Sequence, residues 1–373
     1  MRWPCGPQRR RLAPQRARRG SGAGTGGERM TLADWLWAIP VFGLMIFMHE
    51  LGHFAVAKFF DIRVHEFALG FGPALVGFNR GETRYSLRAI PLGGFVRMAG
   101  MDPSEPDDPR GFNSKPIYQR ALTIFAGPFM NFLLASLLLS GYIYAQGVPV
   151  SEPIFGDVLA ECNGQPCPAA MAGLQKGDRV LTIGGSPVEN WSDILTYVGT
   201  SEGAPLEIRF ERDGQEMTTV LTPVYMDGRW MIGIQQATRP GSFWKALAQG
   251  PSITWEYSKA WVASLVQAVT GRTELELSGP VGITREIATQ ASAGLTNLLW
   301  LTAFLSINLG LFNLLPIPAL DGSHLLFMAV EAVRGRRLDP ERVNMVHFFG
   351  FLLLMGLILV VTYGDLRAAI LGQ

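Results

Sequence analysis

The segment WLWAIPVFGLMIFMHELGHFAVAKFF, residues 35–60, determines the fold class that we predict for this chain. Its apolar run, at about 35–58, has the roughly 20 residues that a helix needs to cross the hydrocarbon layer of a bilayer. Backbone polar groups in lipid must be satisfied within the segment, so the run predicts a transmembrane helix rather than a strand. The HELGH sequence of residues 49–53 therefore falls within a membrane span.

Three further apolar runs follow, at about 121–145, 296–318 and 343–363. The chain is 48% hydrophobic and 17% charged, with a mean hydropathy of +0.19, whereas a soluble domain carries about 25% charged residues. Any single run could be a buried core helix. Four together predict an α-helical polytopic membrane protein with four transmembrane helices in a lipid bilayer.

The charges predict how the chain crosses the membrane. The net charge of +1 carries no nucleic-acid signature, and we expect no nucleic-acid partner. Basic residues gather in 58–120 and in 334–342. The positive-inside rule places both segments in the cytoplasm. Segment 146–295 and both chain ends then lie outside.

Residues 1–29 conflict with this topology, because their arginine-rich sequence should resist crossing the membrane. No short apolar region with a small-residue cleavage site follows, so the segment is not a signal peptide. Our hypothesis is that this basic N-terminal extension is not translated and that synthesis starts at Met30. N-terminal mass analysis that found residues 1–29 in the native protein would refute this hypothesis.

Residues 150–237 read as a separate β-rich module. Short apolar strands at 180–183 and 206–210 accompany a hairpin turn at Asp213-Gly214, and short helices are expected near 168–173 and 191–199. The stretch AAMAGLQKGDRVLTIGG, residues 169–185, resembles the core of a bacterial PDZ domain. That resemblance implies a groove that binds an extended peptide or a C-terminus by strand addition. The alternative is a PDZ domain that only packs beside the membrane part.

Two features around this module are ambiguous. Cys162 and Cys167, in ECNGQPC, could form a disulfide in an oxidising compartment or remain free thiols, and two cysteines alone do not make a zinc site. Residues 240–270 are aromatic and weakly amphipathic, which predicts a pair of interfacial helices on the outer surface or the core aromatics of an extended module. The predicted organisation is a membrane part at 30–145 with a cytoplasmic β-hairpin or loop region, a PDZ domain at 150–237, an interfacial helical linker at 238–292 and a second membrane part at 293–373.

The HELGH sequence carries the chemistry. Residues i and i+4 of a helix share a face, so His49 and His53 can bind one zinc ion, and Glu50 beside them can act as the general base. The alternative is two satisfied histidines and a surface glutamate. It fails because His49 would lie about 20 Å below the outer surface, where such groups are costly unless they pair or bind metal.

A third ligand is expected because catalytic zinc usually has three protein ligands and a water. Asp321 in NLLPIPALDG, residues 313–322, supplies it. Pro316 and Pro318 cannot continue a regular helix, so the chain should unwind before Asp321. The first and third spans run in the same direction, which lets Asp321 reach the depth of the histidines. The alternative is an aspartate that only caps a following helix.

Several residues are candidates for binding substrate. Tyr85 and Leu87 alternate with polar residues in a predicted edge strand at 82–90, which Pro91 and the Gly93-Gly94 pair should end or turn, and this strand could pair with an unwound substrate. Water is expected to enter near a 61–80 loop. Three asparagines complete the set of candidates, with interhelical hydrogen bonds as the alternative role: Asn131, Asn308 and Asn313. For Asn131, in GPFMN, packing between helices is the favoured role. The other histidines, His65, His324 and His347, are expected to be interfacial.

Taken together, HELGH, AGPFMN (126–131), the PDZ-like core and NLLPIPALDG resemble the site-2 protease family, of the bacterial regulator-of-sigma-E protease type. The resemblance implies one Zn²⁺ ion held by His49, His53 and Asp321, with Glu50 as catalytic acid and base. It implies a zinc metalloendopeptidase that cleaves the transmembrane segments of single-span proteins, such as anti-sigma factors, in regulated intramembrane proteolysis. It also implies a multi-pass protein of the cell inner membrane, with a periplasmic PDZ domain and an active site open to the cytoplasm.

The chain departs from the family in one respect, and two competing functions are disfavoured. Some relatives carry two tandem PDZ domains, and this chain has room for one. A membrane adaptor with structural zinc is disfavoured because a structural site needs no base such as Glu50 and is usually closed by four ligands. A transporter is disfavoured because four spans without paired broken helices fit that class poorly.

Overall fold

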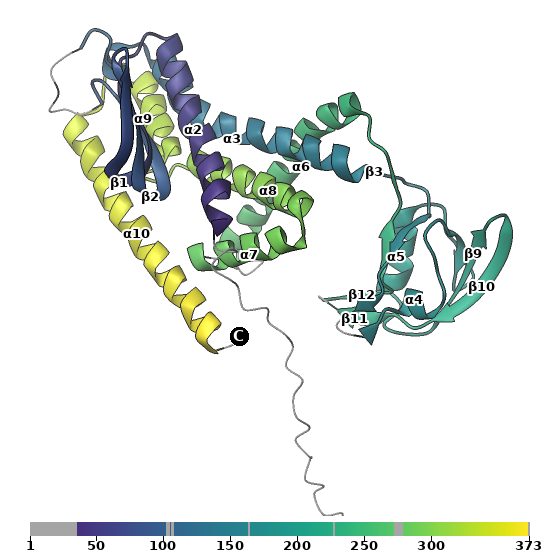
Figure 1. Cartoon of the computed structure of the whole chain (residues 1–373). Helices are drawn as coiled ribbons and strands as arrows, with labels where there is room; N and C mark the ends of the chain where they lie inside the picture. The colour runs from purple at the N-terminus through teal and green to yellow at the C-terminus, as the bar shows by residue number, and fades with distance from the viewer. Residues whose placement is uncertain are drawn as a thin grey trace, which may run out of the picture.

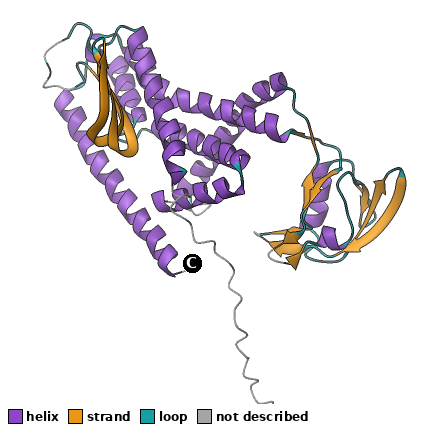
Figure 2. Ribbon diagram, viewed as in Figure 1, coloured by secondary structure: helices purple, strands orange, loops and turns teal. Residues whose placement is uncertain are grey.

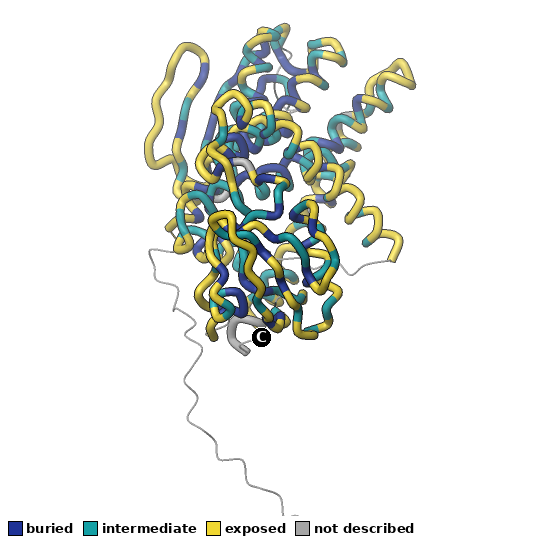
Figure 3. The backbone as a smooth tube through the Cα atoms, turned by 90° about the vertical axis from the view of Figure 1, so that its right-hand side faces the viewer, coloured by how far each residue is buried: buried dark blue, intermediate teal, exposed yellow. Residues whose placement is uncertain are grey.

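The computed structural model describes residues 36–371 except 102–104, 106–107, 163–164, 227 and 272–278. The predicted N-terminal extension, residues 1–29, lies outside the described residues. Helices and strands are largely segregated into a helical part, which also holds one long β-hairpin, and a β-rich part that stands to one side (Figures 1 and 2). Each part has its own buried interior (Figure 3).

The four predicted spans are confirmed as helices long and apolar enough to cross a membrane. They are α2 (Ala38–Phe59), α3 (Ile117–Gln146), α8 (Leu295–Leu314) and α10 (Pro340–Leu371). Helix α3 is central, since it packs against α2, α6, α8 and α9. Only 6% of the apolar window of α10 is buried, so most of this helix is left to face lipid. The remaining helices of the helical part are η1 (Phe112–Ser114), α6 (Phe243–Val269), α7 (Pro280–Ala293) and α9 (Asp321–Arg334).

Glycine sets the distance between α2 and α3. A Cβ atom at Gly52 would collide with the backbone carbonyl of Ala126 and with the side chain of Met130. Only glycine therefore allows the two backbones to approach this closely. The contact brings the HELGH face of α2 against the AGPFMN stretch of α3.

The β-hairpin between α2 and α3 corrects two predictions, the loop at 61–80 and the edge strand at 82–90. Strand β1 (Val64–Arg80) occupies most of the segment predicted as a loop at 61–80. Strand β2 (Thr83–Met98) turns at Pro91 and Gly93-Gly94, as one of the two predicted outcomes has it, because its segments 84–87 and 94–98 pair with 64–69 in opposite directions. Both strands bend, so each contributes two segments to the strand pairing. Segment 64–69 pairs with 94–98 on one side and with 84–87 on the other, while 74–80 pairs with 83–88.

The predicted edge strand is therefore an inner strand. Tyr85 pairs with Phe67 on one side and with Phe78 on the other. The free edges are 94–98 and 74–80, because no strand among the described residues pairs with their outer sides. Positive φ angles at Gly70, Gly72 and Gly93 allow the bends, at +88°, +81° and +118°. Figure 1 shows the hairpin between α2 and α10.

The β-rich part agrees with the predicted elements. Its main sheet has the order β10-β9-β7-β8, with β7 and β9 at the predicted strands and a hairpin turn at Asp213-Gly214, where φ is +51° and +78°. The predicted short helices are α4 and α5, and α5 begins with a capping box of Asn190 and Asp193. The elements are β3 (Val148–Pro149), β4 (Phe155–Val158), β5 (Glu161–Cys162), β6 (Gln165–Pro166), α4 (Pro168–Met171), β7 (Arg179–Ile183), β8 (Ser186–Pro187), α5 (Trp191–Gly199), β9 (Leu206–Arg212), β10 (Gln215–Leu221), β11 (Val224–Met226), β12 (Arg229–Met231), β13 (Ile234–Gln236) and β14 (Thr238–Arg239).

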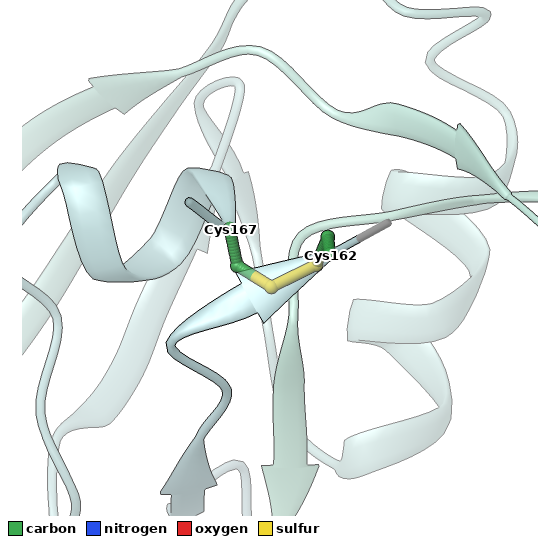
Figure 4. The surroundings of a disulfide bond; sticks show 2 residues. All are labelled: Cys162 and Cys167. Carbon is green, nitrogen blue, oxygen red and sulfur yellow. A yellow bond between two sulfur atoms is a disulfide. The ribbon is translucent and has the colours of Figure 1, made fainter. Parts of the chain in front are cut away.

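Cys162 and Cys167 form a disulfide, which decides between the two alternatives left by the sequence (Figure 4). Cys162 ends β5, and Cys167 directly precedes α4. The bond closes the β5–β6 hairpin, and both residues are buried. The sulfurs pack against the Gly233 turn, where a side chain would collide with them.

The structure also differs from the predicted pair of interfacial helices at 240–270. A single helix, α6, spans this range and packs along α3 and α8. Phe243 contacts Tyr144 near the end of α3, while Trp261 contacts Phe312 near the end of α8. The close contact is possible because Gly250 faces the backbone of Ser136. The polar residues of α6 thus serve partly to pack against other helices.

Candidate active site

The two histidines of HELGH meet as their spacing predicts. One turn of α2 separates His49 from His53, and their Nε2 atoms lie 3.2 Å apart. Both side chains are largely buried, with 12% and 8% of their surface exposed. Two imidazole nitrogens are thus directed at one point inside the helical part.

Asp321 completes the cluster from a distant part of the chain. Helix α8 ends at Leu314, the next residues are irregular, and α9 begins at Asp321, as the two prolines predict. The tight turn needs Gly322, because a Cβ there would collide with the carbonyls of Leu314 and Leu315. Asp321 Oδ2 lies 3.1 Å from His49 Nε2 and 3.3 Å from His53 Nε2.

The three atoms have the geometry of a metal site. They form a triangle with edges of 3.1, 3.2 and 3.3 Å, and among the described residues they are the only group of three such ligands. Bonds of about 2.0–2.1 Å to a tetrahedral zinc ion place neighbouring ligand atoms roughly 3.3–3.4 Å apart. Asp321 Oδ2 is buried and accepts no hydrogen bond from the described residues. The residues therefore fit a zinc ion with a fourth position left for water or substrate.

Glu50 lies beside this cluster but does not belong to the three-ligand group. Its Cγ atom faces Gly94, where an added Cβ would come within 3.0 Å of it. The carboxylate-bearing side chain thus lies between the histidines and the free edge of the hairpin at 94–98. This is where a general base would act on a substrate held at that edge.

Helix α3 contacts both imidazole rings at Nδ1, the nitrogen that points away from the three-ligand cluster. His53 Nδ1 lies 2.9 Å from the carbonyl oxygen of Thr123, and its ring rests against Gly127. His49 Nδ1 lies 3.0 Å from the side-chain amide of Asn131, which is fully buried. The structure therefore turns Asn131 toward His49 and away from any surface that a substrate could reach.

The other predicted substrate-binding residues are spread around the site. Tyr85 joins a cluster of aromatic rings on the inner strand, and Leu87 is half-exposed. Asn313 donates a hydrogen bond to Leu309 O of its own helix. The side-chain oxygen of Asn308 is buried and has no partner among the described residues.

The remaining histidines lie outside the three-ligand cluster, as expected. His324 and His347 stack with ring centroids 4.2 Å apart, and His347 Nδ1 accepts the N–H of Ala319 in the loop before Asp321. His65 lies 3.7 Å from Glu105 in the segment between α2 and α3. His347 thus supports the loop that presents Asp321.

Two features of the site were not predicted from the sequence. A cavity of about 500 Å³ runs along the free edge strand, lined by Phe95, Val96, Arg97, Met98, Met101, Glu105 and Asn344. In addition, Arg120 of α3 forms a two-pronged, largely buried ion pair with Glu331 of α9, at 2.6 and 3.0 Å. This pair fastens α9, which begins with Asp321, to α3. The Gly93-Gly94 pair was the signal available for the first feature, because the turn predicted there leads into the edge strand at 94–98.

The chain was compared with known proteins. A family model described as peptidase family M50 matches residues 37–357. The chain is 35% identical to a zinc metalloprotease, RasP, of Geobacillus kaustophilus, over 90% of this chain and 98% of that protein. It is 37% identical to a putative zinc metalloprotease of Clostridium acetobutylicum, over 90% and 98%. It is 34% identical to the regulator of sigma-W protease RasP of Bacillus subtilis, over 88% and 97%.

Proposed function

This chain belongs to peptidase family M50, and we propose that it is a zinc-dependent endopeptidase that hydrolyses peptide bonds inside transmembrane segments of single-span membrane proteins. The observation that carries the proposal is the convergence of His49, His53 and Asp321 within 3.3 Å beside Glu50. These residues come from helices α2 and α9. The four membrane-spanning helices supply the setting in which the substrate would also be a membrane segment.

In the proposed mechanism, His49 Nε2, His53 Nε2 and Asp321 Oδ2 would hold the zinc ion. When bound, such an ion lowers the pKa of a water molecule toward ~7 and polarises a carbonyl group. Glu50 accepts the proton of the attacking water and passes it to the leaving amine.

We propose that the substrate binds along the free edge strand at 94–98. A helical peptide bond is hydrogen-bonded within its own helix, so the substrate must be extended before it is attacked. The 94–98 edge has unpaired backbone groups, adjoins the cavity of about 500 Å³, and passes Glu50 at Gly94. Strand addition there would bring the scissile bond next to the general base. Tyr85 and Leu87 lie beyond segment 64–69 and would support this edge only through that segment. The unpaired Asn308 oxygen is an available acceptor for a substrate N–H.

The proposed orientation puts the β-rich part in the periplasm and the active site toward the cytoplasm. The arginine-rich segments 58–120 and 334–342 support cytoplasmic ends for α2, α3, α8 and α10. The Cys162–Cys167 disulfide supports an oxidising compartment for the β-rich part. We propose that this part is a PDZ domain that binds a peptide or C-terminus of the substrate. An anti-sigma factor is the proposed class of substrate in the cell inner membrane, because the Bacillus subtilis relative is named a regulator of sigma-W protease.

The test is the cleavage of a co-expressed single-span membrane protein by Glu50→Gln. This variant keeps the three proposed ligands and removes the base, so we expect bound zinc with no cleavage. Glu216→Gln, at an exposed glutamate of β10, is the matched control and should cleave normally. Full cleavage by Glu50→Gln would refute the protease mechanism and favour the adaptor function instead.

A further inference from the structure

If zinc binds Nε2 of each histidine, the other ring nitrogen, Nδ1, must have a suitable hydrogen-bond partner. This inference rests on the proposed function. A neutral imidazole that binds metal through Nε2 carries its proton on Nδ1. That N–H needs an acceptor, and the acceptor fixes both the tautomer and the orientation of the ring. Each of the two histidines should therefore have an acceptor within hydrogen-bond distance of Nδ1.

His53 meets this demand through the backbone. Its Nδ1 lies 2.9 Å from the carbonyl oxygen of Thr123, which can only accept. The ring is also packed against Gly127 and is almost fully buried. His53 thus presents Nε2 to the metal position without help from any other side chain.

His49 meets the demand only through Asn131. Its Nδ1 lies 3.0 Å from Nδ2 of the Asn131 amide, while Asn131 Oδ1 is buried and has no partner among the described residues. With zinc on Nε2, two donors would face each other in this arrangement. Rotation of the amide by 180° exchanges its oxygen and nitrogen without a change of volume. The outward Oδ1 has no partner among the described residues, so the contact with His49 is what fixes the amide, and a protonated Nδ1 of His49 favours the rotated orientation.

We propose that Asn131 Oδ1 accepts a hydrogen bond from His49 Nδ1–H and so holds His49 in the tautomer that binds zinc through Nε2. Asn131 is then a positioning residue that acts through His49 and does not touch substrate. It is well suited to this task because it is fully buried. Its backbone oxygen also accepts a hydrogen bond of 2.9 Å from Ser306 Oγ of α8. Helices α2, α3 and α8 are thereby tied together at the metal site.

The experiment measures zinc affinity of purified full-length protein in detergent, by competition with a chelating dye. Asn131→Leu keeps the size and removes the acceptor, and we expect affinity to fall by about 10–100-fold. Asn131→Asp offers only acceptor atoms, so its affinity should equal or exceed that of the wild type. Ser136→Ala is the control on the same helix, because Ser136 bonds to Phe132 O and Thr254 and not to the site.

Two results would overturn the inference. One is an Asn131→Leu affinity within twofold of wild type, which would mean that His49 needs no acceptor there. The other is an Asn131→Asp protein as weak as Asn131→Leu, which would mean that the amide nitrogen faces the ring. If Asn131→Leu does not fold, the Asn131→Asp affinity alone decides. A wild-type protein that binds no zinc would instead refute the proposed function, and the two failures are thus distinguishable.

Discussion

Replacement of Gly127 by alanine tests the packing of α3 behind the metal site. An added Cβ at Gly127 would stand within 2.9 Å of three atoms of the His53 ring, including Nε2, whereas ordinary contact begins at 3.4 Å. The ring cannot retreat freely, because Nδ1 is held by Thr123 O and the side chain is buried. His53 Nε2 must therefore leave its place in the triangle with His49 and Asp321.

The required displacement is on the order of 1 Å, and a misplacement of that size costs about 100-fold in rate. We therefore expect Gly127→Ala to lower cleavage of a co-expressed single-span substrate by about 100-fold. Zinc affinity should fall as well, since one of the three ligands is moved. Both effects are measured on the same membrane preparation, with substrate fragments quantified by immunoblot and metal quantified after purification.

Gly141→Ala is the matched control on the same helix. No atom lies within 4 Å of the position that its Cβ would take, and the residue is exposed. Alanine favours a helix by about 1 kcal/mol over glycine, so this variant should be as active as wild type and no less stable. Cleavage by Gly127→Ala within twofold of wild type would refute the reasoning, because the His53 ring would then not rest on Gly127.

Two further predictions concern ion pairs at the ends of the helical part, away from the β-rich part. Arg120→Met removes the closer partner of the buried Glu331 carboxylate and leaves it only Arg337, at 3.7 Å. We expect the free energy of unfolding to fall by at most about 3–5 kcal/mol, and the loss should be largely recovered when Glu331→Leu is added; an unchanged melting temperature in the single variant would contradict this. Hydrogen bonds from Arg110 and Lys58 lower the pKa of Glu82 from 4.5 to about 2, so this carboxylate should stabilise the fold fully above pH ~4.5 and lose its contribution as the pH falls toward 2. In Glu82→Gln, the melting temperature should therefore depend less on pH between those values. A pH dependence of the melting temperature identical to that of the wild type would count against the ion pairs.

The parts of the fold that sequence predicted well are those set by local periodicity. The four spans follow from apolar runs, and the meeting of His49 with His53 follows from the helical repeat. The unwound chain before Asp321 follows from Pro316 and Pro318, since each proline lacks the N–H that a regular helix needs and the two lie within three residues. Residue types and spacing decide each of these features within one short segment.

The hairpin could not be predicted because its pairing is not local. Segment 64–69 has two partners, 84–87 and 94–98, and which of them ends on the edge depends on bends at Gly70, Gly72 and Gly93. A glycine after a strand is as typical of an end as of a bend. The predicted edge strand at 82–90 was wrong for this reason, although its strand character was right.

The residues that contact the two histidines could not be predicted from the sequence either. Asn131 faces His49 because α2 and α3 approach closely. This approach requires glycine at position 52, since a side chain there would collide with Ala126. The disulfide between Cys162 and Cys167 likewise depended on the β5–β6 hairpin that brings the sulfurs together. These features follow from tertiary contacts that a motif does not encode.

The order in which the chain is synthesised gives the split metal cluster a biological consequence. His49 and His53 enter the membrane early, whereas Asp321 leaves the ribosome only after α8 has been made. Two imidazoles fall short of the three protein ligands of a catalytic zinc site. A nascent chain is thus expected to remain inert until its final segments have been inserted, which spares neighbouring membrane proteins during biogenesis.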